Sequence, residues 1–192
     1  MVTEGALERL GRLLAARSLR YRLVAVGGIA LRLRGIITRY TEDVDIIAAF
    51  DPVSGRLTPA DRPLDPELLE VAQLVAKDLS LEDDWLNSIV ASQWEGTGLP
   101  PGMVDRLEWR TFGGLELGIA GVQDLIALKL YAMVDERREH RPNRKHEHDL
   151  IALIPTPEQW QFARDWVLRQ DASPDWNVSV EEAIADVRHH GR

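Results

Sequence analysis

The sequence predicts an α/β (or α+β) protein whose last third is helical. Three observations support this: an apolar strand leads into a glycine pair and a helical stretch, a second strand carries alternating acids, and a hairpin pattern surrounds Gly113-Gly114. Residues after about 121 show helical periodicity and capping signals. We therefore expect a core over residues 1–120, N-terminal helix included, and a helical part over residues 121–192.

The N-terminal part contains alternating helix and strand signals. In chain order we expect a helix on the leucine stripe of residues 7–14, a strand over 22–26, a helical turn over 29–35, a strand over 43–50, a loop over 51–66 and a helix over 66–79. Residues 51–66 are assigned to a loop because they hold four prolines and two acidic turns. Gly35 is expected to end the helical turn.

The rest of the chain is predicted from turns and caps. Residues 95–102 are expected to form a loop, followed by the hairpin. Helices are expected over 122–138 and 143–154. The sequence Thr156-Pro157-Glu158-Gln159 is a capping box that predicts a helix start, and residues 179–182 form a second box expected to open the final helix.

Composition limits the classes of function. The 192 residues include no cysteine, which excludes disulfides and thiolate metal sites and suits a reducing compartment. The N-terminus reads as an amphipathic helix rather than a signal peptide, and no apolar run is long enough to span a bilayer, so a cytoplasmic location is expected. The net charge of −8 argues against indiscriminate nucleic-acid binding. No DNA sequence recognition is expected.

The segment VGGIALRLRGIITRYTEDVDI, residues 26–46, carries the strongest chemical signal. Side chains alternate along a strand, so Asp43 and Asp45 share one face. Two carboxylates this close favour a shared cation, and such oxygen ligands with substrate phosphates suit Mg²⁺. A glycine pair lets phosphate oxygens approach the backbone, as the Gly27-Gly28 turn would. The order of these features suggests phosphoryl or nucleotidyl transfer.

Taken alone, each of these features has an alternative interpretation. The glycine pair could be an ordinary packed turn, and the two aspartates could be an ordinary acidic strand edge. Other phosphate-binding motifs do not fit, because the lysine of GxxxxGK[ST] is absent and the glycines do not follow GxGxxG. The chain is therefore neither a P-loop protein nor a dinucleotide-binding one.

A single lysine interrupts the apolar stretch of residues 125–134, and such a helix is expected to be largely buried. Lys129 is costly there unless it is paired or lines a polar site. Asp149 is similarly placed before the apolar residues 150–154. One interpretation is a buried Lys129–Asp149 ion pair between antiparallel helices, and the other is a role in a polar site; both are compatible.

These motifs resemble the signature of the DNA polymerase β-like nucleotidyltransferase superfamily, in which strand, GG or GS, and helix precede a strand with two alternating acids. The version here looks like the minimal nucleotidyltransferases, above all the AbiEii-like toxin group and related uncharacterised families. DLIALKLYA, then KHEHDLIAL, and WLN at 85–87 add to the resemblance, which covers roughly residues 21–154. It implies a small mixed sheet flanked by helices, with the C-terminal helices packed on the core.

The resemblance also implies roles for individual residues. Gly27 and Gly28 would hold the triphosphate of an NTP, with Thr41 near it, and Asp43 and Asp45 would bind Mg²⁺ or Mn²⁺. Lys129 would neutralise phosphate charge, and Asp149 would position it or act as a further acid. Arg39 would contact phosphate or cap the strand.

Two points depart from or extend the superfamily pattern. His146 stands in KHEHDL where many relatives have an aspartate, so any role of that acid is in doubt. A third sheet carboxylate is common in the superfamily, and Glu108 and Glu116 are the candidates, although an ordinary solvent-facing role is the alternative for each.

The function expected from this resemblance is Mg²⁺-dependent transfer of a nucleoside monophosphate from an NTP to an acceptor hydroxyl. The acceptor could be RNA, a protein side chain or an aminoglycoside-like small molecule, and a toxin of this type would have a cognate antitoxin. The alternative is a non-catalytic member of the fold that binds a nucleotide or a protein.

Overall fold

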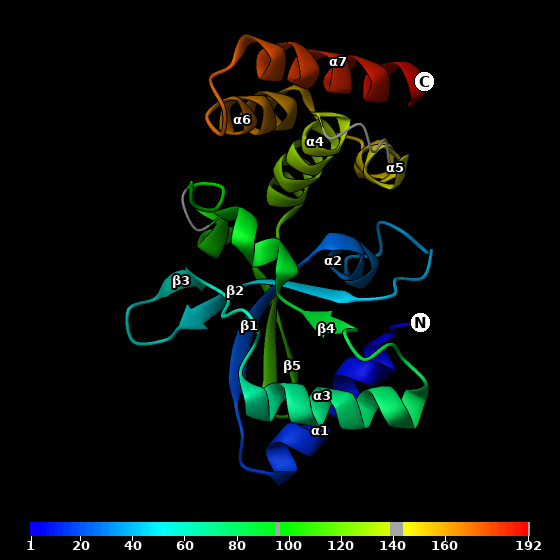
Figure 1. The fold of residues 1–192 in the computed structure, drawn as a ribbon, viewed down its shortest axis with the longest axis vertical. Coiled ribbons are helices and arrows are strands. Elements are labelled where there is room, and N and C mark those ends of the chain that lie inside the picture. The colour runs from blue at the N-terminus through cyan, green and yellow to red at the C-terminus, as the bar shows by residue number, and fades with distance from the viewer. Residues whose placement is uncertain (95–96, 139–143, 192) are drawn as a thin grey trace. The chain divides into compact units, whose positions relative to one another are not determined.

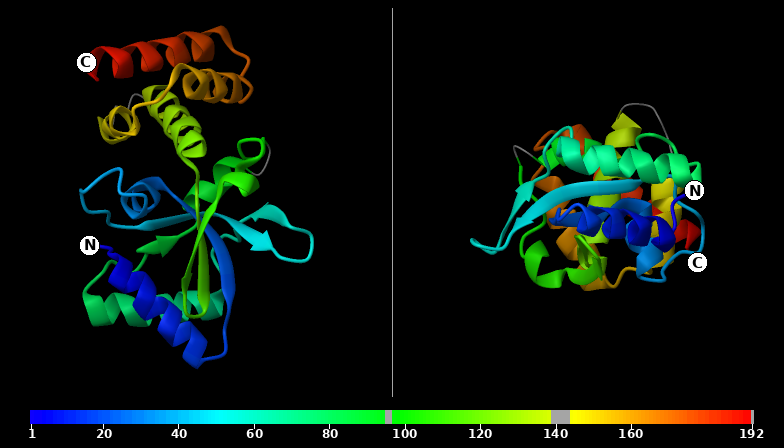
Figure 2. Two further views of the ribbon diagram at one scale, coloured as in Figure 1. Left: turned by 180° about the vertical axis from the view of Figure 1, so that it is seen from behind. Right: turned by 90° about the horizontal axis from the view of Figure 1, so that it is seen from below.

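The structure, a computed structural model, describes residues 1–94, 97–138 and 144–191. It divides into two compact units, Met1–Ala120 and Gly121–Arg192. The first contains a six-stranded mixed sheet flanked by helices, and the second contains helices α4 to α7 (Figures 1 and 2). The predicted α/β fold class is therefore confirmed.

The first unit alternates helices and strands. Its elements are α1 (Glu4–Ala16), β1 (Tyr21–Val26), α2 (Gly27–Leu33), β2 (Val44–Asp51), β3 (Arg56–Pro59), α3 (Pro66–Leu79), β4 (Leu86–Asn87), β5 (Glu108–Phe112) and β6 (Leu115–Ile119). Two short 3₁₀ helices, η1 (Ile89–Trp94) and η2 (Met103–Arg106), lie between β4 and β5.

The sheet has β1 at its centre, in the strand order β3-β2-β1-β6-β5, and β4 pairs with the start of β2. Strand β1 is antiparallel to β2 and parallel to β6, while β5 and β6 form the hairpin predicted around Gly113-Gly114. Residues Leu23 to Val26 of β1 are buried. The strand that leads to the glycine pair is thus fixed in the core of the sheet.

Helices lie on both sides of this sheet. Helix α2 packs against β1 and β2, and α1 packs against α3. In Figure 1, α2 lies above the sheet and α1 and α3 lie below it. Asp65 caps α3 by accepting hydrogen bonds from the Glu67 and Leu68 amides, and the Tyr21 hydroxyl, which also donates to it, lowers the pKa of Asp65. The start of α3 is therefore tied to β1.

The loop predicted over 51–66 was wrong at residues 56–59, which form β3. The Asp51 carboxylate accepts hydrogen bonds from the amides of Val53 and Ser54 and closes a turn, and Gly55 adopts a positive φ of 67°. This turn brings residues 56–59 back against β2, and Pro59 is tolerated at the end of an edge strand.

The second unit contains α4 (Val122–Arg138), α5 (Arg144–Leu153), α6 (Pro157–Leu168) and α7 (Pro174–His190), and α4 packs against the other three. The capping box at Thr156 is confirmed. The predicted helix start at 179–182 was wrong. Ser173 caps α7 through the Trp176 amide, and Pro174 occupies its first turn, so the helix begins earlier.

None of the described helices has the length and apolar character needed to cross a bilayer.

Candidate active site

The glycine pair and the acidic strand lie against each other. Strand β1 ends at Val26, whose partner on β2 is Asp45. Gly27 follows with φ +69°, and a Cβ placed on it would overlap Asp45 Oδ2 and lie 3.2 Å from Asp45 Cγ. The missing side chain of Gly27 therefore creates the space that the Asp45 carboxylate occupies.

Thr41 fixes the backbone on which Asp43 sits. Thr41 is 1% exposed, and its hydroxyl donates to the Asp43 carbonyl oxygen over 2.7 Å. The Thr41 carbonyl accepts a hydrogen bond from the Val2 amide over 2.8 Å. Asp43 itself is partly exposed, directly before β2. Thr41 thus lies at the site, with its hydroxyl bonded to Asp43.

A cationic side chain borders the second glycine. An ideal Cβ at Gly28 would lie 3.6 Å from Arg39 Nη1 and 3.3 Å from Thr41 Oγ1. The segment that carries Arg39 is held by Arg32, whose guanidinium donates to the carbonyls of Thr38 and Arg39. The structure therefore brings together all six predicted residues of this segment: Gly27, Gly28, Arg39, Thr41, Asp43 and Asp45.

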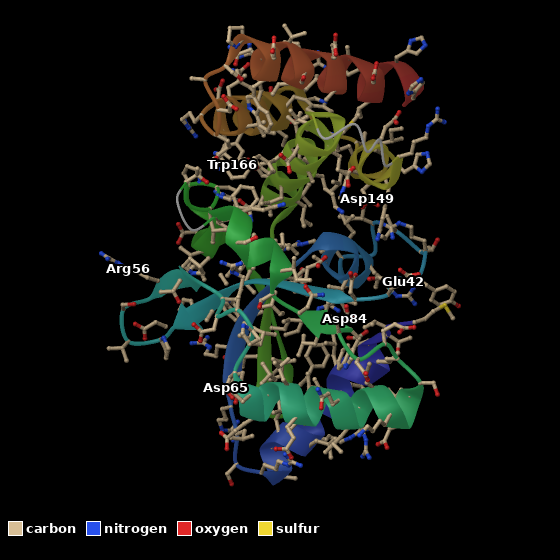
Figure 3. All side chains as sticks on the ribbon, in the orientation of Figure 1. Glu42, Arg56, Asp65, Asp84, Asp149 and Trp166 are labelled. Atoms are coloured by element: carbon tan, nitrogen blue, oxygen red, sulfur yellow. The ribbon has the colours of Figure 1, made fainter. Side chains whose placement is uncertain are left out.

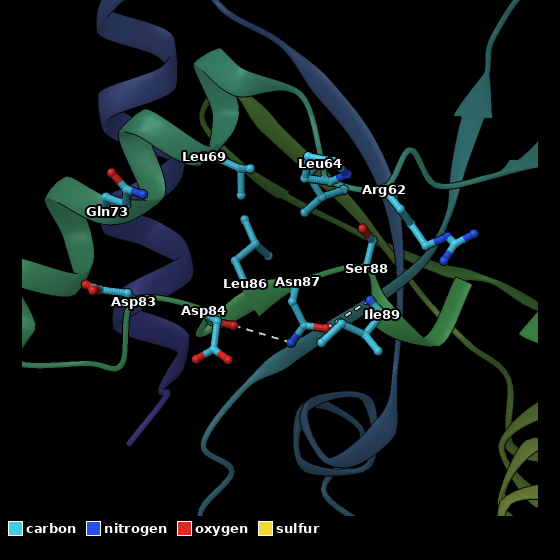
Figure 4. A pocket seen from close by; sticks show the side chains of 11 residues that line it. Arg62, Leu64, Leu69, Gln73, Asp83, Asp84, Leu86, Asn87, Ser88 and Ile89 are labelled. Atoms are coloured by element: carbon cyan, nitrogen blue, oxygen red, sulfur yellow. Dashed lines mark hydrogen bonds between the residues drawn. The ribbon is translucent and has the colours of Figure 1, made fainter. Parts of the chain in front are cut away.

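Asn87 is a neighbour of Asp45 to which sequence reasoning gave no role. The two residues are partners in the parallel β2–β4 pairing, so their side chains share a sheet face about 4.8 Å apart. The Asn87 amide donates to the Asp84 carbonyl and its oxygen accepts from the Ile89 amide, as Figure 4 shows. The only sequence signal was the WLN motif, because a two-residue strand has no periodicity.

Asn87 also lines a pocket of about 400 Å³ at the edge of the sheet (Figure 4). Leu64, Leu69 and Leu86 form apolar walls, and Asp83 and Asp84 are exposed side chains of the lining. The rim of this pocket, at Asn87, therefore lies one strand spacing, about 4.8 Å, from Asp45.

The two candidate third carboxylates lie elsewhere. Glu116 pairs with Arg22, at the other end of β1 from Val26, and forms a 2.6 Å salt bridge with it. Glu108 is on β5, three strands from β2, and pairs with Arg110 at 3.0 Å and Arg34 at 3.4 Å. Glu116 is about 13 Å along the strand from the level of Asp45, given about 3.3 Å per residue. The structure brings neither glutamate to the aspartate pair.

The second unit contains the predicted ion pair. Lys129 Nζ on α4 lies 2.8 Å from Asp149 Oδ2 on α5, and their side chains are 7% and 1% exposed; Figure 3 labels Asp149. His146 Nδ1 lies 3.4 Å from Lys129 Nζ, and His146 Nε2 lies 3.1 Å from Glu136 Oε1. Lys129 and Glu136 are seven residues apart, about two helical turns, and therefore lie on the same side of α4. This spacing is the sequence signal that one side chain of α5, here His146, could contact both.

The donor set of the first unit fits a hard divalent cation. Asp43 and Asp45 offer carboxylate oxygens, and Mg²⁺ is usually held by one or two carboxylates plus substrate phosphates. Within the described ranges, no three histidine, cysteine or acidic side chains form a metal-binding group.

The comparison with known families agrees with this geometry. Residues 6–141 match the family described as "Nucleotidyltransferase of unknown function (DUF6036)". No curated protein matches the chain. The match includes the glycine pair, both aspartates and Lys129, and it covers well over half of the chain. The chain therefore belongs to this DUF6036 family of nucleotidyltransferases of unknown function.

Proposed function

We propose that the chain is a Mg²⁺-dependent nucleotidyltransferase that moves a nucleoside monophosphate from an NTP to an acceptor hydroxyl. The carrying observation is the contact between the Gly27 backbone and the Asp45 carboxylate. This contact puts the Gly27 backbone directly beside the Asp45 carboxylate, which we propose to hold a metal ion together with Asp43. The family assignment supports transfer of a nucleotide over simple phosphate binding.

Each candidate residue, six in the first unit and two in the second, has a distinct role in this proposal. Gly27 and Gly28 admit the triphosphate to the backbone, and Arg39 beside Gly28 offsets phosphate charge. Asp43 and Asp45 would hold Mg²⁺, which when bound neutralises charge on the phosphate oxygens. Thr41 holds Asp43 in place through the Asp43 carbonyl. Lys129 adds positive charge for the phosphates, and Asp149 orients Lys129.

The proposed reaction is a substitution at the α-phosphorus. The acceptor oxygen forms a bond to this phosphorus, and the bond between the α-phosphorus and its bridging oxygen to the β-phosphate breaks. Pyrophosphate leaves and the hydroxyl proton passes to water. The acceptor is proposed to be RNA or a protein hydroxyl, as in toxin–antitoxin systems of AbiEii-like type, with an aminoglycoside-like small molecule as a further choice.

The test is transfer of label from four α-³²P NTPs with Mg²⁺, alone and with total RNA or cell lysate. Wild-type protein is expected to label an acceptor, and Asp43→Asn and Asp45→Asn are expected to abolish labelling because each removes a metal-binding charge. Glu42→Gln is the matched control. Glu42 is an exposed residue directly before Asp43 (Figure 3), and its substitution removes the same single negative charge. Equal labelling by wild type and both aspartate variants would refute the proposal.

A second candidate function, nucleotide or protein binding without transfer, is favoured by one observation. Glu108 and Glu116 are engaged with arginines away from the aspartates. A non-catalytic member would bind Mg²⁺·NTP in a calorimetric titration and transfer no label to any acceptor. Binding lost in Asp45→Asn, together with absent transfer, would favour this second function.

A further inference from the structure

The pocket at the edge of the sheet lies beside the aspartate site. Its volume of about 400 Å³ falls in the range of small-molecule sites, about 300–1,000 Å³. All of its lining residues belong to the first unit, Met1–Ala120, as Asp45 does. The pocket and the aspartate site are therefore parts of one compact unit.

The walls of the pocket are mostly apolar. The apolar lining residues are Pro63, Leu64, Leu69, Leu86 and Ile89. Leu64 and Leu86 are buried, whereas Ile89 is 71% exposed and adds apolar surface at the mouth. A ligand with an apolar body would remove this surface from water, which favours its binding.

The ionisable side chains of the lining are two aspartates and one arginine. Asp83 and Asp84 are both exposed, on the segment between α3 and β4. In Figure 4 they lie on one side of Leu86, while the guanidinium of Arg62 lies on the other side and points away from the leucines. The acidic side of the mouth therefore attracts a cation and repels the phosphates of a nucleic acid.

Asn87 gives the pocket a polar group at the end nearest to Asp45. Its amide donates to the Asp84 carbonyl and its oxygen accepts from the Ile89 amide, so its orientation is fixed. The side-chain amide has a second hydrogen, and its oxygen has a second lone pair. These groups can hydrogen bond a ligand hydroxyl about one strand spacing from Asp45.

We propose that this pocket binds the acceptor, and that the acceptor is a small organic cation with an apolar body and a hydroxyl group. The apolar body occupies the leucine-lined cavity, the cationic group faces Asp83 and Asp84, and Asn87 orients the hydroxyl on the Asp45 side of the pocket. The assignment of the ligand as the acceptor rests on the proposed function. It selects a small molecule over RNA, whose phosphates the acidic mouth repels.

Tyramine is the first probe, because it combines a phenolic hydroxyl, an aromatic body and an ammonium group. 4-Ethylphenol lacks only the ammonium, and 3-(4-hydroxyphenyl)propionate carries a carboxylate in its place. In NMR titrations without nucleotide, tyramine is expected to shift the methyl signals of Leu69 and Leu86 with a dissociation constant of about 1 mM. It is expected to bind about fivefold more tightly than 4-ethylphenol, with the propionate weakest. This preference is expected to shrink between about 50 and 500 mM salt. Equal affinities for the three probes would overturn the inference.

Removal of the acidic charge tests the recognition of the cation. Asp83→Asn/Asp84→Asn is expected to lower tyramine affinity about fivefold, to that of 4-ethylphenol, because the backbone carbonyl of residue 84 that holds Asn87 is kept. Glu67→Gln/Glu82→Gln is the matched control, since it removes the same charge from two exposed residues outside the lining. Equal loss of tyramine affinity in both double variants would overturn the inference.

Filling the cavity tests the position of the probe. Gln73 is an exposed lining residue on α3, and Gln73→Trp is expected to weaken binding of all three probes about tenfold by occupying the apolar space. Leu74→Trp is the control, because Leu74 is the next residue of the helix and lies outside the lining. Thermal unfolding verifies that the compared proteins are folded. Wild-type affinity in Gln73→Trp would place the probe elsewhere and overturn the inference.

Transfer assays connect the pocket to the reaction. With Mg²⁺ and an α-³²P NTP, the phenolic oxygen of tyramine forms the bond to the α-phosphorus, pyrophosphate leaves and the phenolic proton passes to water. Gln73→Trp is expected to raise KM for tyramine about tenfold and to change KM for the NTP less than about twofold. A rise in KM for the NTP alone would identify a nucleotide pocket and overturn the inference, as would label on RNA or protein and on neither phenol. Absence of transfer to every acceptor refutes the proposed function, whereas the titrations still decide whether the pocket binds organic cations.

Discussion

Gly27 meets two physical requirements at one position. Its φ of +69° lies in the left-handed region, and its missing Cβ gives the Asp45 carboxylate its place. Gly35 shares only the first requirement, since it has φ +72° and a Cβ added there would meet no atom within 4 Å. A comparison of alanine substitutions at Gly27 and Gly35 therefore separates the effect of backbone strain from the effect of displacing the Asp45 carboxylate.

Gly27→Ala is expected to abolish nucleotidyl transfer and to lower the free energy of unfolding by more than Gly35→Ala does. Left-handed strain costs each variant about 1–2 kcal/mol, and Gly27→Ala adds the displacement of Asp45. Urea unfolding and transfer assays measure the two effects. Gly35→Ala is expected to keep full transfer activity at the temperature of the assay. Wild-type activity in Gly27→Ala would show that the position of Asp45 is not needed.

At the scale of elements, a buried ion pair joins α4 to α5. Lys129→Met is expected to destabilise the protein by about 3–5 kcal/mol, because it leaves Asp149 as a buried charge without its cation. The double variant Lys129→Met/Asp149→Leu is expected to recover most of this loss, since no buried charge of the pair remains. Urea unfolding of the single and double variants measures the recovery.

Transfer activity distinguishes the two roles of Lys129 in the same proteins. If the lysine serves only to join the helices, the stable double variant will transfer nucleotide at the wild-type rate. We expect it to remain inactive, because the ammonium that offsets phosphate charge is gone. A stable and active double variant would restrict Lys129 and Asp149 to a structural role.

Elements with strong local signals could be predicted from the sequence, and elements fixed by distant partners could not. The glycine pair, the acidic strand and the Thr156 cap have local patterns, and the structure places them where those patterns indicate. Strand β4 is two residues long and exists through its pairing with Val44 and Asp45. Likewise, the ion pairs that hold Glu108 and Glu116 depend on strand order, which their alternation with apolar residues does not reveal.

At the scale of the molecule, the family match and the compact units have different boundaries. The match covers residues 6–141, so it contains the first unit's strands and α4, while His146 and Asp149 lie beyond it. The aspartate site belongs wholly to the first unit, Met1–Ala120. The family match therefore contains the whole aspartate site and Lys129, but not the Asp149 partner of Lys129.

The total charge bears on the choice of acceptor. With a net charge of −8, the chain releases few counterions from nucleic acid, so general RNA binding is expected to be weak. Fluorescence anisotropy with a labelled single-stranded RNA is expected to give a dissociation constant above about 10⁻⁴ M at 150 mM salt, weaker than typical non-specific binders. The logarithm of the affinity is expected to change little between 50 and 200 mM salt, with a slope smaller than about 2.

The same titration with Mg²⁺ and a non-hydrolysable NTP analogue tests how an RNA acceptor would be selected. If RNA is the acceptor, binding must come from contacts with one particular sequence or end, because the net charge opposes general attraction. Transfer to one RNA species in total RNA, with weak and salt-insensitive binding of other RNAs, fits that mode. Micromolar binding of unrelated RNA with a steep salt slope would instead reveal a basic surface that outweighs the acidic total, and the acceptor would then be selected after binding.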